Sequence, residues 1–256
     1  MFSVALHFDH PLRFFLRREF REMPVVRREL REKTAVKDVI EACGVPHPEV
    51  DLIVWHSDES TSHSVDLAWP VERDATLAIH GVPAPAELLP DAPRLQQRQL
   101  SRFVADGHLG KLARNLRLLG IDTAYERDAD DRRLLAIAAA EDRVLLTRDR
   151  RLLMHSVVRH GFCPRSDDPE LQTREVLQRF GLSDETQALA PFTRCLQCNA
   201  PLTRAPLDEV RERLAGEPLT LRFYTEFRRC TGCAKIFWPG SHFQKLATTV
   251  ARFTAV

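Results

Sequence analysis

Four of the six cysteines form two C-x-x-C pairs, a spacing that suits metal binding. The pairs are Cys195 with Cys198 in RCLQCNAPL and Cys230 with Cys233 in RRCTGCAKIFW, with 31 residues between Cys198 and Cys230. Two tight turns of this kind direct four thiolates at one ion, in the tetrahedral arrangement that zinc prefers. Since four ligands leave no open coordination position, the pattern predicts a structural Zn²⁺ site. The alternative, redox-active thiols, would need one pair at the start of a helix.

Three aspartates follow or precede apolar segments in a way that could gather carboxylates at one edge of a sheet. Asp106 follows RFVA, Asp149 ends VLLTRD, and Asp131 begins DRRLLAIAAA. The carboxyl ends of parallel strands share one crevice, and oxygen ligands without a histidine cluster favour Mg²⁺ or Mn²⁺. Taken singly, each aspartate could instead be a turn residue or a helix cap, and Asp128 or Asp130 could be the cap in place of Asp131.

Basic residues lie near these acids in the sequence and could bind the phosphates of an anionic substrate. They are Lys111, Arg114, Arg117, Arg148, Arg150 and Arg151, and the alternative for each is a solvated helix face. Arginine accounts for all but five of the 37 basic residues, and its planar fork suits phosphate. His242, in WPGSHF, could contact phosphate or pack on Trp238. Together these residues favour a nucleic acid as the partner.

The elements that must position these groups alternate between strands and helices. Strands are predicted in RFVAD, IDTAYE, VLLTRD and FCPRS, and helices in GHLGKLARNLRLLG, DDRRLLAIAAAEDR, RRLLMHSVVRHG and DPELQTREVLQRFGL. Such alternation implies right-handed crossovers and a mainly parallel sheet. Residues 100–190 are therefore predicted to form one open α/β domain, and residues 191–256 a small ribbon around the cysteine pairs.

The N-terminal residues 1–84 predict a different, α+β unit. FSVALHF, VDLIVW and ATLAIHGV are expected to be strands, and TAVKDVIEACGVP a helix that Thr34 caps and Gly44 ends. Residues 85–99 follow, with prolines that indicate a linker. The charge balance changes there too: residues 1–90 carry 10 Lys and Arg against 15 Asp and Glu, whereas residues 91–256 carry 27 against 21. This asymmetry supports a polyanionic partner for the C-terminal part.

Composition excludes several protein classes. The longest apolar runs are far shorter than the roughly 20 residues that a membrane span needs, so no membrane association is expected. The first residues, MFSVALHFDH, lack the pattern of a signal peptide. Unpaired cysteines with metal-binding spacing suit a reducing compartment. We therefore expect a cytoplasmic location.

FVADGHLGKLARNLRLLGIDTAY, DADDRRLLAIAAAEDRVLLTRDRRLL and the two cysteine knuckles together resemble the Mut-seven C-terminal domain ribonuclease family. The resemblance covers about residues 101–245. It implies a PIN-like nuclease domain followed by a zinc ribbon, and metal-dependent RNA cleavage by Asp106, Asp131 and Asp149. Some members carry an N-terminal ubiquitin-like domain, and TAVKDVIEACGVPHPEVDLIVW is similar to its helix and following strand. The resemblance therefore also implies a β-grasp domain over residues 1–84.

The chain departs from the PIN pattern at one position. Many PIN nucleases have a further acid shortly after the third one, but here Arg150 and Arg151 follow Asp149. Asp128 or Asp130 would have to supply that acid for a second metal ion. The ubiquitin-like region continues as HGVPAPAE without a terminal Gly-Gly, so conjugation or sulphur transfer by that chemistry is excluded. Docking of a protein partner or regulation is the expected role of this region.

Two hypotheses from different classes result. The first is a metal-dependent endoribonuclease with Mg²⁺ or Mn²⁺ at the aspartates, structural zinc in the ribbon, and Lys111, Arg114, Arg148, Arg150 and His242 on the RNA. The second is a catalytically weak RNA-binding adaptor whose ubiquitin-like domain recruits a partner. A phosphatase of the haloacid dehalogenase type is set aside because position 108, where a D-x-D motif needs its second acid, is histidine. A dinucleotide site is set aside because Gly107 and Gly110 do not make G-x-G-x-x-G.

Overall fold

The computed structural model describes all residues except 58–60, 85, 183–188, 217 and 255–256. The chain forms two compact units, each built from two separate stretches. The first unit comprises residues 1–100 and 130–164, and the second comprises residues 101–129 and 165–256. This division cuts across the region expected to be one nuclease domain, and the four segments expected from the sequence stay a prediction.

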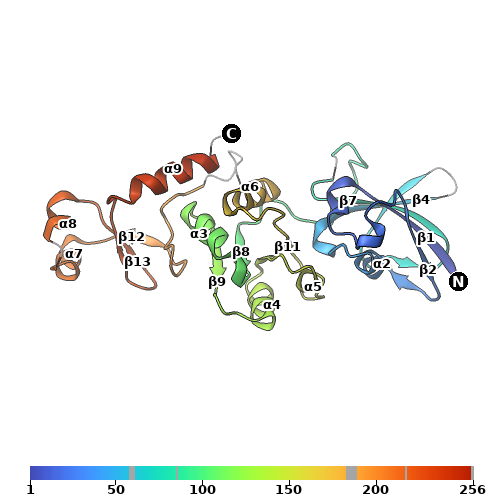
Figure 1. The fold of residues 1–256 in the computed structure, drawn as a ribbon, viewed down its shortest axis with the longest axis horizontal. Coiled ribbons are helices and arrows are strands. Elements are labelled where there is room, and N and C mark those ends of the chain that lie inside the picture. The colour runs from blue at the N-terminus through green and yellow to red at the C-terminus, as the bar shows by residue number, and fades with distance from the viewer. Residues whose placement is uncertain (58–60, 85, 183–188, 217, 255–256) are drawn as a thin grey trace. The chain divides into compact units, whose positions relative to one another are not determined.

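The N-terminal part of the first unit is a five-stranded sheet with the strand order β2-β1-β7-β4-β5 (Figure 1). β1 and β7 pair in parallel, and the other neighbours pair antiparallel. Alternate residues of β7 are buried, as a sheet with one covered face requires. The long strands are β1 (Phe2–Phe8), β2 (Val26–Leu30), β4 (Val50–His56), β5 (Ser62–Val65) and β7 (Ala75–Gly81).

One helix and several short elements complete this β-grasp fold. α2 (Val36–Ala42) buries Val36, Val39 and Ile40. The short elements are α1 (His10–Arg13), η1 (Arg18–Phe20), η2 (His47–Glu49), β3 (Thr34–Ala35) and β6 (Pro70–Val71). The predicted N-cap is wrong: Ala35 precedes the helix without a capping side chain, because Thr34 pairs with Val71 in the β3–β6 bridge. Gly44, with φ +104°, follows the helix as expected.

The proline-rich segment after β7 packs on this domain. The buried carboxylate of Asp51 accepts hydrogen bonds from the backbone N–H groups of Ala84 at 2.9 Å and Gln96 at 3.3 Å. Leu88, Leu89 and Ala92 pack against the buried cluster around Leu52. The segment expected to be a linker is therefore held at both ends by one carboxylate.

The rest of the first unit carries two of the predicted acidic residues. Its elements are α4 (Asp131–Ala140), β10 (Val144–Leu146), α5 (Arg150–Leu153) and β11 (Gly161–Phe162), and β10 pairs in parallel with β11. The helix predicted over RRLLMHSVVRHG is much shorter than expected. It ends at Leu153, and the backbone N–H of Val157 donates to Nδ1 of His155 instead of to a helical carbonyl.

The second unit begins with a strand–helix–strand crossover. Its elements are β8 (Arg102–Ala105), η3 (Gly107–Leu109), α3 (Gly110–Leu118), β9 (Asp122–Tyr125) and, further on, α6 (Pro169–Phe180). β8 and β9 pair in parallel, and α3 packs on α6 through a hydrogen bond from Asn115 Nδ2 to Thr173 Oγ1 of 3.1 Å. Phe103 and Phe180 meet edge to face at 5.2 Å. Parallel pairs with flanking helices confirm the predicted α/β, PIN-like class.

The C-terminal part of the second unit is the predicted ribbon. β13 (Arg228–Cys230) lies between β12 (Leu202–Arg204) and β14 (Ile236–Phe237) in an antiparallel sheet, and three helices accompany it: α7 (Leu207–Arg213), α8 (Pro218–Phe223) and α9 (Phe243–Thr254). α9 returns to α6 (Figure 1). There Arg252 pairs with Glu170 at 2.9 Å. Within the described residues, the apolar stretches of the helices are all too short to cross a bilayer.

Candidate functional site

The four paired cysteines converge on one point. Their sulfurs all lie within 4.8 Å of one another, with 3.8 Å between Cys195 and Cys233 and 3.3 Å between Cys198 and Cys230. A tetrahedral zinc site requires four thiolate sulfurs gathered in this way. The donor set therefore fits zinc, and residues far apart in the sequence complete it.

The two knuckles share one backbone geometry. Asn199 follows the first pair with φ +71° and donates its N–H to the carbonyl of Cys195 at 3.0 Å. Ala234 follows the second pair with φ +58° and donates to the carbonyl of Cys230 at 3.1 Å. A Cβ atom on Gly232 would lie 2.9 Å from the Cβ of Ala200, so glycine is required there. These matching turns aim two sulfurs each at the shared centre.

The protein environment changes the acidity of these thiols in opposite directions. Burial raises the pKa of Cys195 to about 12. At Cys198 burial also acts to raise the pKa, but hydrogen bonds from the backbone of Ala200 and from the neighbouring cysteines outweigh it and lower the pKa to about 6. Cys198 is exposed, and its lowered pKa favours the thiolate form. A thiolate is the form that binds a metal ion.

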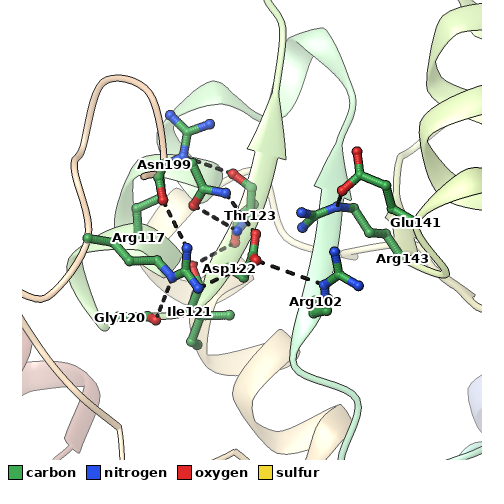
Figure 2. A network of polar contacts seen from close by, with 10 residues as sticks. Arg102, Arg117, Gly120, Ile121, Asp122, Thr123, Glu141, Arg143 and Asn199 are labelled. Carbon is green, nitrogen blue, oxygen red and sulfur yellow. Dashed lines mark hydrogen bonds and ion pairs between the residues drawn. The ribbon is translucent and has the colours of Figure 1, made fainter. Parts of the chain in front are cut away.

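A buried arginine attaches the first knuckle to the α/β part of the second unit. Arg117 of α3 donates to the carbonyl of Thr123 in β9 at 2.9 Å (Figure 2). It also donates to the carbonyls of Leu196 and Gln197, at 3.3 and 2.9 Å. Burial lowers the pKa of Arg117, while the nearby thiols and Asp122 act to raise it. Arg117 is used here for structure and not for phosphate binding.

Asn199 adds a second set of contacts at the edge of β9 (Figure 2), and Arg194 joins it. The side chain of Asn199 donates to Asp122 at 2.7 Å and accepts from the backbone N–H of Thr123 at 3.0 Å. Arg194 lies 3.4 Å from the same carboxylate. The sequence analysis did not predict this network. Its one local signal in the sequence is Asn199 directly after Cys198, because asparagine tolerates the left-handed backbone conformation.

Asp149 both ends the segment after β10 and caps α5. Its Oδ1 accepts hydrogen bonds from the backbone N–H groups of Arg151 at 2.8 Å and Leu152 at 3.3 Å. The hydroxyl of buried Thr147 accepts from the N–H of Asp149 at 3.0 Å and fixes the turn. The side chain is exposed, so the carboxylate lies at the protein surface.

Asp131 stands at the first position of α4, directly after the residue that caps the helix. The cap is Asp130, which accepts from the N–H of Arg133 at 2.8 Å. Of the alternatives that the sequence left open, Asp130 is therefore the capping residue, and the exposed carboxylate of Asp131 does not have this task. Asp128 is exposed in the turn after β9.

Asp106 ends β8 and is half-buried. It precedes the short helix η3 but its side chain makes no capping bond there. The following glycines allow close packing: a Cβ on Gly107 would lie 2.6 Å from the carbonyl oxygen of Arg127, and one on Gly110 would lie 2.6 Å from the hydroxyl of Tyr125. Gly107 is thus needed because the backbone of Arg127 approaches it closely. Asp106 does not cap η3.

The predicted basic residues have different environments. Lys111 is exposed in a pocket of about 640 Å³ that also includes His108 and Arg127. Arg114 and His242 are exposed and line another pocket of the second unit. Arg148 is exposed beside Asp149 in the sequence. A role of these residues in RNA binding stays a prediction.

Arg150 and two residues of η2 hold the β-grasp domain to residues 130–164 within the first unit. Arg150 donates to the carbonyl of Phe15 at 3.0 Å and lies over the ring of Phe14. Glu49 accepts from the N–H of Cys163 at 2.8 Å, and His47 Nε2 lies 2.7 Å from the carbonyl oxygen of Val158. Glu49 and His47 are buried, so this is a packed contact between distant parts of the chain.

These features define a protein in which a β-grasp domain precedes a PIN-like α/β domain and a four-cysteine ribbon. Residues 101–250 match the family model of the Mut7-C RNAse domain, and residues 1–66 match that of the Mut7-C ubiquitin domain. The chain therefore belongs to the Mut7-C RNAse domain family, and the predicted resemblance is confirmed. No curated protein and no solved structure matches it.

Proposed function

We propose that this protein is a metal-dependent endoribonuclease that hydrolyses RNA phosphodiester bonds. The match of residues 101–250 to the Mut7-C RNAse domain carries this proposal. Asp106, Asp131 and Asp149 are the proposed catalytic acids. In support, Asp130 and not Asp131 caps α4, and Asp149 accepts both capping bonds of α5 through Oδ1.

The three proposed acids would supply carboxylate oxygens, the ligands that a hard divalent cation prefers. Mg²⁺ or Mn²⁺ bound there would lower the pKa of a water molecule and offset charge on the phosphate. Lys111, Arg114 and Arg148 are the proposed phosphate contacts and orient the RNA strand. Asp128 is the remaining candidate for a further acid, because Asp130 is already used as a helix cap.

Zinc in the ribbon has a structural role in this proposal. The four thiols fit zinc, and a closed four-ligand site holds the two knuckles together without a position for substrate. The basic surface near the ribbon would then aid RNA binding. A cytoplasmic location is part of the proposal, because these free cysteines suit a reducing compartment.

The test uses isosteric variants with labelled RNA. Asp106→Asn and Asp149→Asn should each lower the cleavage rate by at least 100-fold in Mg²⁺ or Mn²⁺, with RNA binding retained. Asparagine at position 149 can still accept the two capping bonds, so folding should be preserved. Asp208→Asn, an exposed change on α7, is the matched control and should cleave normally.

The products provide a second readout. Attack by water should leave 5′-phosphate and 3′-hydroxyl ends, and chelation should stop the reaction. Unchanged cleavage by both asparagine variants would exclude the proposed acids. A 2′,3′-cyclic phosphate would show that the 2′-hydroxyl attacks, and would exclude the proposed mechanism.

An RNA-binding adaptor is the second candidate function. The match of residues 1–66 to the Mut7-C ubiquitin domain favours it, because a ubiquitin-like surface can bind a protein partner. The adaptor hypothesis expects RNA binding without metal-dependent cleavage across a panel of structured and single-stranded RNAs. Cleavage that depends on Asp149 would exclude it as the main function.

A further inference from the structure

A pocket of about 530 Å³ lies in the second unit, and the three proposed catalytic acids are not among its lining residues. It is lined by α3, the segment before the first knuckle, the strands β13 and β14, and the segment that enters α9. Its volume falls within the range of small-molecule sites and is suited to one nucleotide.

Aromatic side chains from three segments line this pocket. Phe192 and Phe243 lie 4.7 Å apart with an angle of 35° between their rings, and Phe243 is 36% exposed. Trp238 packs on Phe227 at 6.3 Å. Gly240 leaves room beside the indole, since a Cβ there would lie 3.0 Å from Trp238 Nε1. The pocket thus offers ring faces that are held in place by neighbouring rings.

Positive charge surrounds the aromatic residues. Arg114, Arg194, Arg228 and Lys235 line the pocket, and Glu226 is the acidic lining residue. Arg194 is fixed by Asp122 and by the carbonyl of Asn199 at 2.9 Å, and Arg228 donates to the carbonyl of Phe192 at 3.4 Å. Within the described part of the chain, the side chains of Arg114 and Lys235 have no acidic partner. Two cations therefore remain available to an anionic ligand.

We propose that this pocket binds one unpaired nucleotide of single-stranded RNA, with its base on the aromatic residues and its phosphate near Arg114 and Lys235. Unpaired bases stack on aromatic side chains, whereas bases within a duplex stack on one another and do not offer their faces. The excess of positive charge favours a nucleotide over an acidic or purely apolar peptide. The proposal rests on the proposed function only in taking RNA as the ligand.

The test measures binding of a fluorescent single-stranded oligoribonucleotide to the zinc-loaded full chain, without Mg²⁺ or Mn²⁺. Phe243→Ala should weaken binding by about 10-fold, the loss expected for one base-stacking contact. Phe243→Tyr should bind like the wild type. Lys235→Ala should weaken binding less than Phe243→Ala does. It should also make the slope of log affinity against log salt concentration shallower by about one, because one phosphate contact is lost.

Phe223→Ala is the matched control, because Phe223 lies on α8 in the same unit and is 70% exposed but is not a lining residue. Phe223→Ala should leave the affinity for the single strand unchanged. As a second control, a blunt RNA duplex should bind Phe243→Ala and the wild type equally. The pocket would be excluded as the RNA-binding site if Phe243→Ala bound the single strand as tightly as the wild type does. Equal losses of affinity for Phe243→Ala and Phe223→Ala would exclude it too. If binding depends on Phe243 but no cleavage follows when Mg²⁺ or Mn²⁺ is added, the proposed nuclease function is excluded and the pocket is retained.

Discussion

The six cysteines have two different chemical environments. Four of them form the cluster that fits zinc, whereas Cys43 and Cys163 are fully buried elsewhere. Burial raises the pKa of Cys43 to about 11, and its thiol donates to the carbonyl of Val39. At pH 8 this thiol is therefore protonated as well as inaccessible, and it should not react with thiol reagents.

We predict a two-stage thiol titration of the zinc-loaded protein at pH 8. The four clustered thiols should react after a chelator is added in native buffer, because thiol release and metal release are linked. All six should react only in denaturant. Reaction of all six in native buffer after chelation would contradict the separate, stable burial of Cys43 and Cys163.

At the scale of elements, the ribbon depends on one helix residue as well as on its own cysteines. Arg117 supplies three hydrogen bonds from α3 to β9 and the first knuckle. Arg117→Ala should lower the free energy of unfolding by about 3 kcal/mol, because buried carbonyls would lose a charged donor. Arg117→Lys should not restore stability, since an ammonium group lacks the planar fork.

Urea unfolding and the rate of zinc release to a chelator measure this effect. Arg114→Ala is the matched control, because Arg114 is exposed on the same helix. Its stability should be within about 0.5 kcal/mol of the wild type. Equal stability of Arg117→Ala and Arg114→Ala would show that the knuckle does not depend on α3.

Elements with short-range signals could be predicted from the sequence, and those set by distant contacts could not. Each C-x-x-C turn is encoded within a few residues, so the cysteine cluster was predictable. The apolar faces of α3 and α6 likewise gave both helices. The start of α2 after Ala35 could not be predicted, because it depends on the pairing of Thr34 with Val71 of β6. The early end of α5 is an exception, because the bond from Val157 to His155 that follows it is local but has no signal in the apolar pattern.

The positions of the candidate acids on strands and helices were predictable to the same extent, and their catalytic role stays a prediction. The sequence places Asp106, Asp131 and Asp149 at the ends of strands or the start of a helix, and the structure has them there. The uses of Arg117 and Arg150 were not predictable, because their partners lie in other segments. The carbonyl that Arg150 contacts is 135 residues away in the sequence.

At the scale of the whole molecule, the β-grasp domain is part of a larger compact unit and not an appended module. Glu49 and His47 connect it to residues 158–163 by buried hydrogen bonds. This arrangement gives the N-terminal domain a structural role, in addition to any partner that it recruits.

We predict that Glu49→Ala lowers the free energy of unfolding by about 2 kcal/mol, because the buried N–H of Cys163 loses the carboxylate acceptor. Glu49→Gln keeps an acceptor oxygen and should lose about half as much. Hydrogen exchange at Cys163 should accelerate in the alanine variant. Exchange and stability like those of the wild type would show that this contact contributes nothing to the first unit.

The four-cysteine cluster also constrains the order of events during synthesis. Its two halves are separated by 31 residues, so a ribosome translating at about 5 to 20 residues per second needs roughly 2 to 6 s between Cys198 and Cys230. Throughout that interval the nascent chain carries the thiols of Cys195 and Cys198 without the second cysteine pair that completes the site. Because the site needs thiols from both pairs, a chain made in a zinc-starved cell would be completed with four thiols and no ion to close the ribbon.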